Sequence, residues 1–130
     1  QVNGTGDSLY QENSESYSRL NPVSMKTTTL DSLQRTHSLG LPDLLKIDTQ
    51  GSEIEILRGA STFLAKIPLV YLESPVTTYN LGAPTLSEYL RFMEDNGFLL
   101  FSINEFHRAQ EQRNIQQLDL LFFNTVLVSA

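Results

Sequence analysis

The sequence predicts an α/β layered fold with a mainly parallel sheet and an antiparallel hairpin at its carboxyl end. Short apolar segments typical of buried strands alternate with amphipathic segments that carry helix start signals. Two of the apolar segments end in an acidic residue, Asp48 and Glu73. The last two, 98–103 and 119–128, follow each other with only a polar segment between them, which favours antiparallel pairing.

Length and composition limit the possible functions. A chain of 130 residues is long enough for one domain, and 40% hydrophobic with 18% charged residues is ordinary for a soluble globular protein. The net charge of −6, with basic residues scattered, argues against nucleic acid as a partner. The absence of Cys rules out a thiolate site and fits a reducing, cytoplasmic location. No apolar run approaches the roughly 20 residues of a membrane span.

The first third of the chain contains little regular structure. Residues 1–22 are rich in Gly, Ser, Asn and Glu and are predicted to form a loop. Residues 23–28 alternate apolar and polar side chains, which predicts a strand. A short helix is expected over residues 29–39, ended by Gly40 and Pro42.

Two strand–helix units follow. Residues 44–48 form an apolar run typical of a strand buried on both faces, and Ser52 with Glu55 predicts a capping box for the next helix. The apolar stripe of that helix is Ile54, Leu57, Ala60 or Ser61, and Leu64. A strand over 68–73 comes next. A second capping box, Thr85 with Glu88, predicts a helix that ends at Gly97.

The ends of the two predicted strands are the place to look for chemistry. Ligands bind outside the carboxyl ends of strands in open α/β sheets, where Asp48 and Glu73 both lie. Gly51 would allow a close approach of the backbone to a ligand. Asp48 could bind a hydroxyl or ammonium group or accept a proton, but it could equally cap the following helix.

Other polar residues favour structural roles. Lys46 shares a strand face with Asp48, so an ion pair is the favoured interpretation. His37 and His107 have no carboxylate or histidine at the spacing of a metal site. We therefore expect exposed histidines and no metal ion.

Several segments together resemble the second half of an FkbM-type methyltransferase. They are TLDSL (29–33), PDLLKIDTQGSEIEILRGA (42–60), VYLE (70–73), YNLGAP (79–84), GF (97–98) and DLLFFN (119–124). The pattern LKID-x-QG-x-E-x-x-x-L-x-GA is specific, and the likeness runs through about four-fifths of the chain.

This resemblance implies S-adenosylmethionine as cofactor, a Rossmann-like sheet, and methyl transfer to a hydroxyl of a sugar, glycolipid or natural product. The acceptor would be a small molecule or glycan. By the same resemblance, Asp48 or Glu53 would act as the catalytic base or positioning group, and which of them does so is left open. Glu73, Gln50 and Gly51 would bind substrate.

The chain departs from the family pattern in one respect. It contains no Gly-rich loop after a first strand and no acid ending a second strand, so residues 23–130 are expected to be the carboxyl-terminal part of one methyltransferase domain. The cofactor-binding residues would then lie upstream of Gln1, and this chain alone would be inactive. The strand 44–48 would become a sheet edge that invites self-association. The alternative is a non-enzymatic α/β binding module.

Overall fold

The computed structural model describes residues 8–10, 24–77, 80–108 and 114–128. Its centre is a four-stranded sheet in the order β1 (Leu44–Ile47), β2 (Leu69–Pro75), β4 (Ile115–Asn124), β3 (Phe98–Arg108). β1 is parallel to β2, whereas β2 with β4 and β4 with β3 are antiparallel. The α/β class and the hairpin are confirmed. The described sheet is mixed rather than mainly parallel, because the hairpin inserts β4 next to β2.

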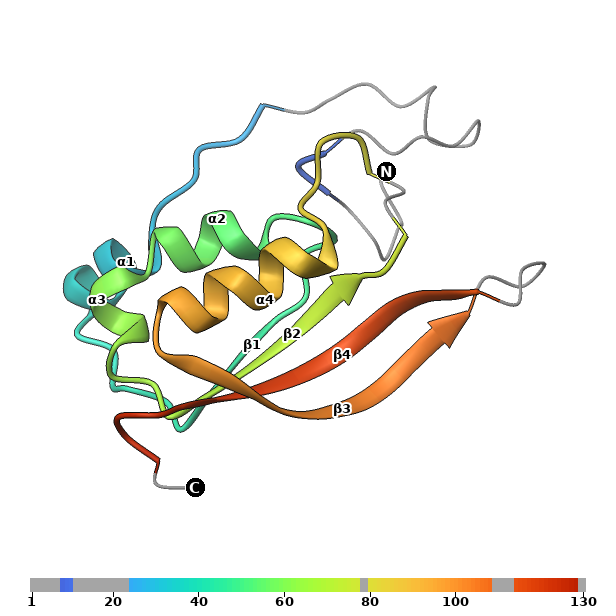
Figure 1. Ribbon diagram of the computed structural model, residues 1–130. Coiled ribbons are helices and arrows are strands. Elements are labelled where there is room, and N and C mark those ends of the chain that lie inside the picture. Colours follow the sequence, from blue (N-terminus) through green and yellow to red (C-terminus); the bar gives the residue numbers. More distant parts are fainter. Residues whose placement is uncertain (1–7, 11–23, 78–79, 109–113, 129–130) are drawn as a thin grey trace.

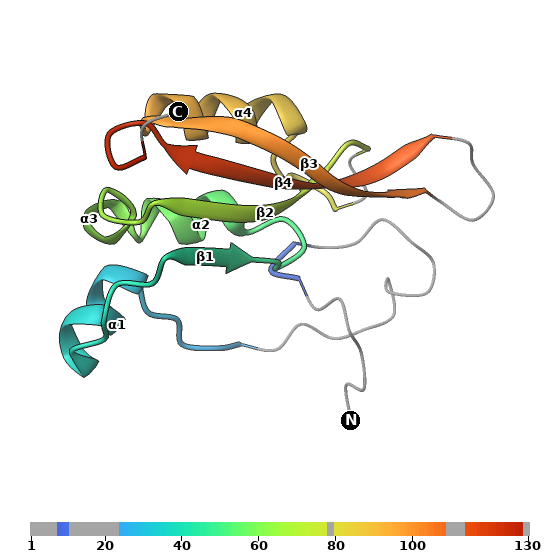
Figure 2. The same ribbon diagram turned by 90° about the horizontal axis from the view of Figure 1, so that it is seen from below.

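Helices cover one face of this sheet. They are α1 (Leu30–His37), α2 (Glu53–Arg58), α3 (Ser61–Leu64) and α4 (Leu86–Asp95). Figure 1 shows α2 and α4 side by side along one face of the sheet, and Figure 2 shows the sheet from its other face. Among the described residues, no helix lies over that second face. We call the two sides the covered face and the open face.

The core lies between the covered face and the helices. On β2, Val70, Leu72 and Ser74 are buried, whereas Tyr71 and Glu73 alternate with them and point to the open face. The buried apolar residues are Ile47, Ile54, Leu57, Ala60, Phe63, Leu64, Ile67, Val70, Leu72, Tyr89, Met93, Phe98, Leu120 and Phe122. The stripe predicted from residues 54 to 64 is therefore confirmed, although Gly59 and Ala60 interrupt the helix and divide it into α2 and α3.

The open face combines polar and apolar side chains. Phe101 is 70% exposed, and its ring meets the edge of the Phe123 ring at 6.2 Å between centroids. Leu44 and Leu99 are also exposed. Solvent-exposed aromatic and aliphatic groups contribute little to stability, so the described fold depends mainly on the covered face.

The two predicted helix starts behave differently. At α4 the capping box forms, because Thr85 N–H donates to the Glu88 carboxylate. At α2 the predicted box between Ser52 and Glu55 is wrong, since Ser52 makes no side-chain cap bond. The Ser52 hydroxyl instead donates to Thr49 Oγ1 at 2.9 Å.

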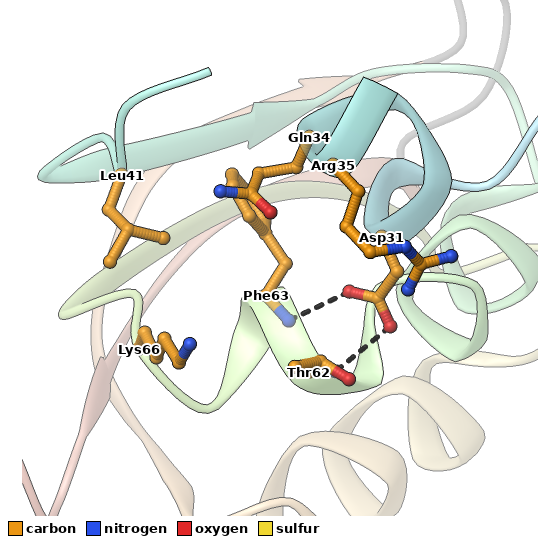
Figure 3. A pocket seen from close by; sticks show the side chains of 7 residues that line it. All are labelled: Asp31, Gln34, Arg35, Leu41, Thr62, Phe63 and Lys66. Atoms are coloured by element: carbon orange, nitrogen blue, oxygen red, sulfur yellow. Dashed lines mark hydrogen bonds between the residues drawn. The ribbon is translucent and has the colours of Figure 1, made fainter. Parts of the chain in front are cut away.

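The predicted helix over 29–39 is confirmed as α1, and its Asp31 also caps a second helix. Asp31 Oδ1 accepts from Phe63 N–H at 2.8 Å and Oδ2 from Thr62 N–H at 3.0 Å, at the start of α3 (Figure 3). Burial acts to raise the pKa of Asp31, but these two N–H donors outweigh it and lower the pKa. A hollow of about 90 Å³ beside this contact extends to Lys66. That volume is well below the roughly 300 Å³ of small ligand sites.

Three strand predictions differ from the structure. The last strand, expected at 119–128, is β4 over Ile115–Asn124, so residues 125–128 lie outside it. Residues 24–28, inside the strand expected at 23–28, are exposed and form neither helix nor strand, and residue 23 lies outside the described part. β1 is not buried on both faces, because it is an edge strand in the described sheet and only Ile47 is buried. The predicted edge at 44–48 is thus confirmed, while self-association through it stays a prediction.

No helix within the described residues has both the length and the apolar character needed to cross a membrane.

Candidate active site

The turn between β1 and α2 brings the candidate residues together. Gln50 has φ 58° and Gly51 has φ 115°, so two consecutive residues adopt left-handed backbone conformations. This reverses the chain sharply after Asp48. The Gln50 carbonyl accepts hydrogen bonds from Asn80 and from Ser8, both at 2.7 Å, which tie the turn to two distant segments.

Gly51 is packed against residues of this chain. A Cβ placed there would lie 3.0 Å from Ala83 Cβ and 3.3 Å from the Tyr10 ring. The positive φ and this crowding together explain why glycine occupies the position. The groups that approach Gly51 most closely are therefore protein side chains.

Glu53 is fully buried, with 0% of its surface exposed. Its Oε1 accepts from Thr49 N–H at 2.8 Å and from the Thr49 hydroxyl at 3.1 Å, and its Oε2 accepts from Gly51 N–H at 3.0 Å and from the Tyr89 hydroxyl. Burial, followed by the bond to Glu53, raises the pKa of Tyr89 well above its ordinary value, which keeps this hydroxyl a donor. Glu53 thus links the turn to α4.

Asp48 and Glu73 lie at the same end of the sheet. Leu72 pairs with Ile47 in the parallel ladder, so Asp48 and Glu73 are the next residues on neighbouring strands. The Gln50 side-chain amide donates to Glu73 Oε1 at 2.6 Å and lies 3.4 Å from Asp48 Oδ1. The two carboxylates thus lie at the same end of the sheet, as their positions after the two predicted strands implied, and Asp48 follows the edge strand β1.

Asp48 is exposed and available to a ligand. It forms the predicted ion pair with Lys46, at 3.5 Å, and 42% of its side chain is exposed. The alternative in which Asp48 caps the helix is not observed, because Ser52 occupies the N-cap position and the recorded partners of Asp48 are Lys46 and Gln50.

Glu73 is half-buried and differs from Asp48 in its electrostatics. Burial raises the pKa of Glu73, and the neighbouring charge of Asp48 raises it further, while the hydrogen bond from Gln50 opposes the change. A second amide, that of Gln117 on β4, also donates to Glu73 Oε1 at 2.6 Å. Two glutamine amides therefore hold this carboxylate in place.

Gln117 was not predicted from the sequence. It lies in a polar segment that gave no sign of belonging to a strand, and it reaches Glu73 only because β4 pairs with β2. That pairing also sets Asp119 directly opposite Glu73 on the open face. The candidate site thus consists of carboxylates and amides from three strands and one turn.

Comparison with known protein families assigns the chain to one family. The family model described as the methyltransferase FkbM domain matches residues 2–100, which include the whole turn, Asp48, Glu53 and Glu73. The chain belongs to this family. A search of curated proteins and a search of solved structures find no match to the chain. The family resemblance inferred from the sequence is therefore confirmed, and the matched residues include Asp48, Gln50, Gly51, Glu53 and Glu73 but not Gln117 or Asp119 of β4.

Proposed function

We propose that this FkbM domain takes part in S-adenosylmethionine-dependent methylation of a hydroxyl oxygen on a sugar, glycolipid or natural-product acceptor. We also propose that the sheet of this domain is arranged as in Rossmann-like folds. The observation that carries it is the Gln50 amide, which lies between the Asp48 and Glu73 carboxylates at the strand ends. This is where an α/β sheet binds its ligands.

The charges at this site fit the proposed reactants. When bound, S-adenosylmethionine would supply an electrophilic methyl group on a positively charged sulfonium. Negative charge on Asp48 and Glu73 suits such a cation, and carboxylate oxygens are suitable acceptors for a hydroxyl proton. We assign no described residue to the binding of the adenosine part.

Asp48 is the proposed base. Its carboxylate is exposed. As the acceptor oxygen bonds to the methyl carbon, the bond from that carbon to sulfur would break, and the proton of the acceptor O–H would pass to Asp48. Glu73, fixed by Gln50 and Gln117, would hold the acceptor in line. Glu53 is a positioning residue in this scheme, because its buried oxygens already accept from Thr49, Gly51 and Tyr89.

The test is Asp48→Asn in the protein as encoded, including any residues that flank this sequence. Methyl transfer to a panel of hydroxylated acceptors is followed by release of S-adenosylhomocysteine. We expect turnover to fall by roughly 100-fold or more, because an amide cannot accept the proton. Circular dichroism should show an unchanged fold, since Asp48 is exposed.

Asp43→Asn is the matched control, because Asp43 is an exposed aspartate before the other end of β1. It should retain full activity. Normal turnover in Asp48→Asn would exclude Asp48 as the base. If the encoded protein bound a hydroxylated acceptor but released no S-adenosylhomocysteine with any acceptor, the binding-module alternative would replace the enzymatic proposal.

A further inference from the structure

Three potential metal ligands meet on the open face of the β3–β4 hairpin. Glu105, His107 and Asp119 each offer one oxygen or nitrogen atom, and these three atoms all lie within 4.8 Å of one another. Glu105 and His107 are two residues apart on β3 and share a face, while Asp119 pairs with Glu105 across the ladder. The strand register therefore holds the three side chains together.

An irregularity in β3 creates this arrangement. Ile103 pairs with Leu120, so an uninterrupted antiparallel ladder would place Asn104 opposite Asp119. A register shift between Ile103 and Glu105 instead places Glu105 there. Bulges of this kind re-aim side chains and are frequent beside functional sites.

The resulting pairing is electrostatically unfavourable unless a cation is present. Glu105 and Asp119 are like charges on directly opposite residues, an arrangement that destabilises a sheet. Within the described residues, the basic side chain within ion-pair distance of this pair is His107, whose Nε2 lies 3.9 Å from Glu105 Oε2. Glu73, opposite Asp119 on its other side, adds further negative charge.

Asp119 is also oriented from outside the cluster. The Tyr71 hydroxyl on β2 donates to Asp119 Oδ2 at 2.8 Å, and the carboxylate is half-buried. A hydrogen bond to one carboxylate oxygen fixes the direction of the other. Partners of this kind orient the ligands in metal sites.

We propose that Glu105, His107 and Asp119 bind one divalent transition-metal ion of the zinc class. One imidazole nitrogen with two carboxylate oxygens suits zinc and its neighbours, whereas magnesium and calcium take oxygen ligands. Zinc–ligand distances of about 2.0–2.2 Å require the ligand atoms to close in slightly, which exposed Glu and His side chains can do by rotation. Three protein ligands leave coordination positions open for water or another ligand.

The proposal is independent of the methyltransferase assignment. All three residues lie beyond residues 2–100, which the FkbM family model matches. It also revises the expectation that His107 has no metal-binding partners, because those partners come from the fold.

Zinc titration of the full 130-residue chain, freed of metal with a chelator, tests the site by calorimetry. We expect one zinc per chain, and a loss of affinity of about tenfold or more in both His107→Ala and Asp119→Asn. Magnesium at the same concentrations should give no binding heat. His37→Ala is the control, because His37 is the other histidine of the chain and lies in α1. It should bind zinc as the wild type does.

Three results would overturn the proposal: no zinc binding by the wild type, unchanged binding in His107→Ala, or binding lost in His37→Ala. Circular dichroism identifies any variant that fails to fold. Glu105→Gln, which keeps the size of an exposed side chain, then provides the same test.

Discussion

The carboxylates on the two sides of the sheet differ in burial and in hydrogen bonding. On the covered face, the buried carboxylate of Glu53 accepts hydrogen bonds from Thr49, Gly51 and Tyr89. On the open face, neighbouring strands bring together four carboxylates, those of Asp48, Glu73, Asp119 and Glu105. Among the described residues, the basic side chains beside them are Lys46, which forms an ion pair with Asp48, and His107, which lies near Glu105. A buried charge must be satisfied within the fold, whereas a partly hydrated charge can remain available to ligands. The difference separates an acid whose hydrogen bonds are satisfied within the fold from acids that are partly exposed.

The largest expected effect compares two phenylalanines. Phe122 is 1% exposed on the covered face, so Phe122→Ala should lower the free energy of unfolding by about 3–5 kcal/mol. Phe101 is 70% exposed on the open face, and Phe101→Ala should cost less than about 1 kcal/mol. Urea denaturation of both variants measures the difference. Equal losses would show that the open face is packed in solution.

Two tyrosines that donate to carboxylates sharpen the comparison. Tyr89→Phe removes a donor from the buried Glu53 and should cost about 1–3 kcal/mol. Tyr71→Phe removes a donor from the half-buried Asp119, where water can replace it, and should cost about 0.5–1 kcal/mol. Chemical denaturation at neutral pH tests both. A larger loss in Tyr71→Phe would contradict the division between the faces.

A further prediction concerns Asp31, a partly buried acid that caps α3. Asp31→Ala should lower the free energy of unfolding by about 1 kcal/mol at pH 7. The pKa of Asp31 is lower in the folded state than in the unfolded state. This contribution to stability is therefore fully present above about pH 4, the ordinary pKa of an aspartate, and is lost as the pH falls through the lower pKa of the folded state.

Denaturation of the wild type and Asp31→Ala at pH 7 and at about pH 3 measures this change. The difference between the two proteins should shrink in acid. Asp31→Asn, which keeps an acceptor oxygen, should lose less at pH 7. A difference that stays constant with pH would mean that the charge of Asp31 does not contribute.

Local signals in the sequence were sufficient for part of the elements. Apolar runs identified β1 and β2, and the Thr85–Glu88 capping box identified the start of α4, because these signals depend on residues within a few positions of each other. The capping box that the sequence also predicted at Ser52 does not form. There Glu53 bonds backward to the turn and across to Tyr89, and a contact 36 residues away has no local pattern.

The sequence by itself determined the family and the position of Asp48 and Glu73 at the same end of the sheet, because a specific motif and parallel strand order carry that information. The tertiary structure decided the neighbours of these acids. The polar segment between 104 and 117 gave no strand signal, yet pairing of β4 with β2 and β3 brings Gln117 to Glu73 and Asp119 to Glu105 and His107. Strand pairing joins residues far apart in the chain, and a bulge of one residue changes which of them meet.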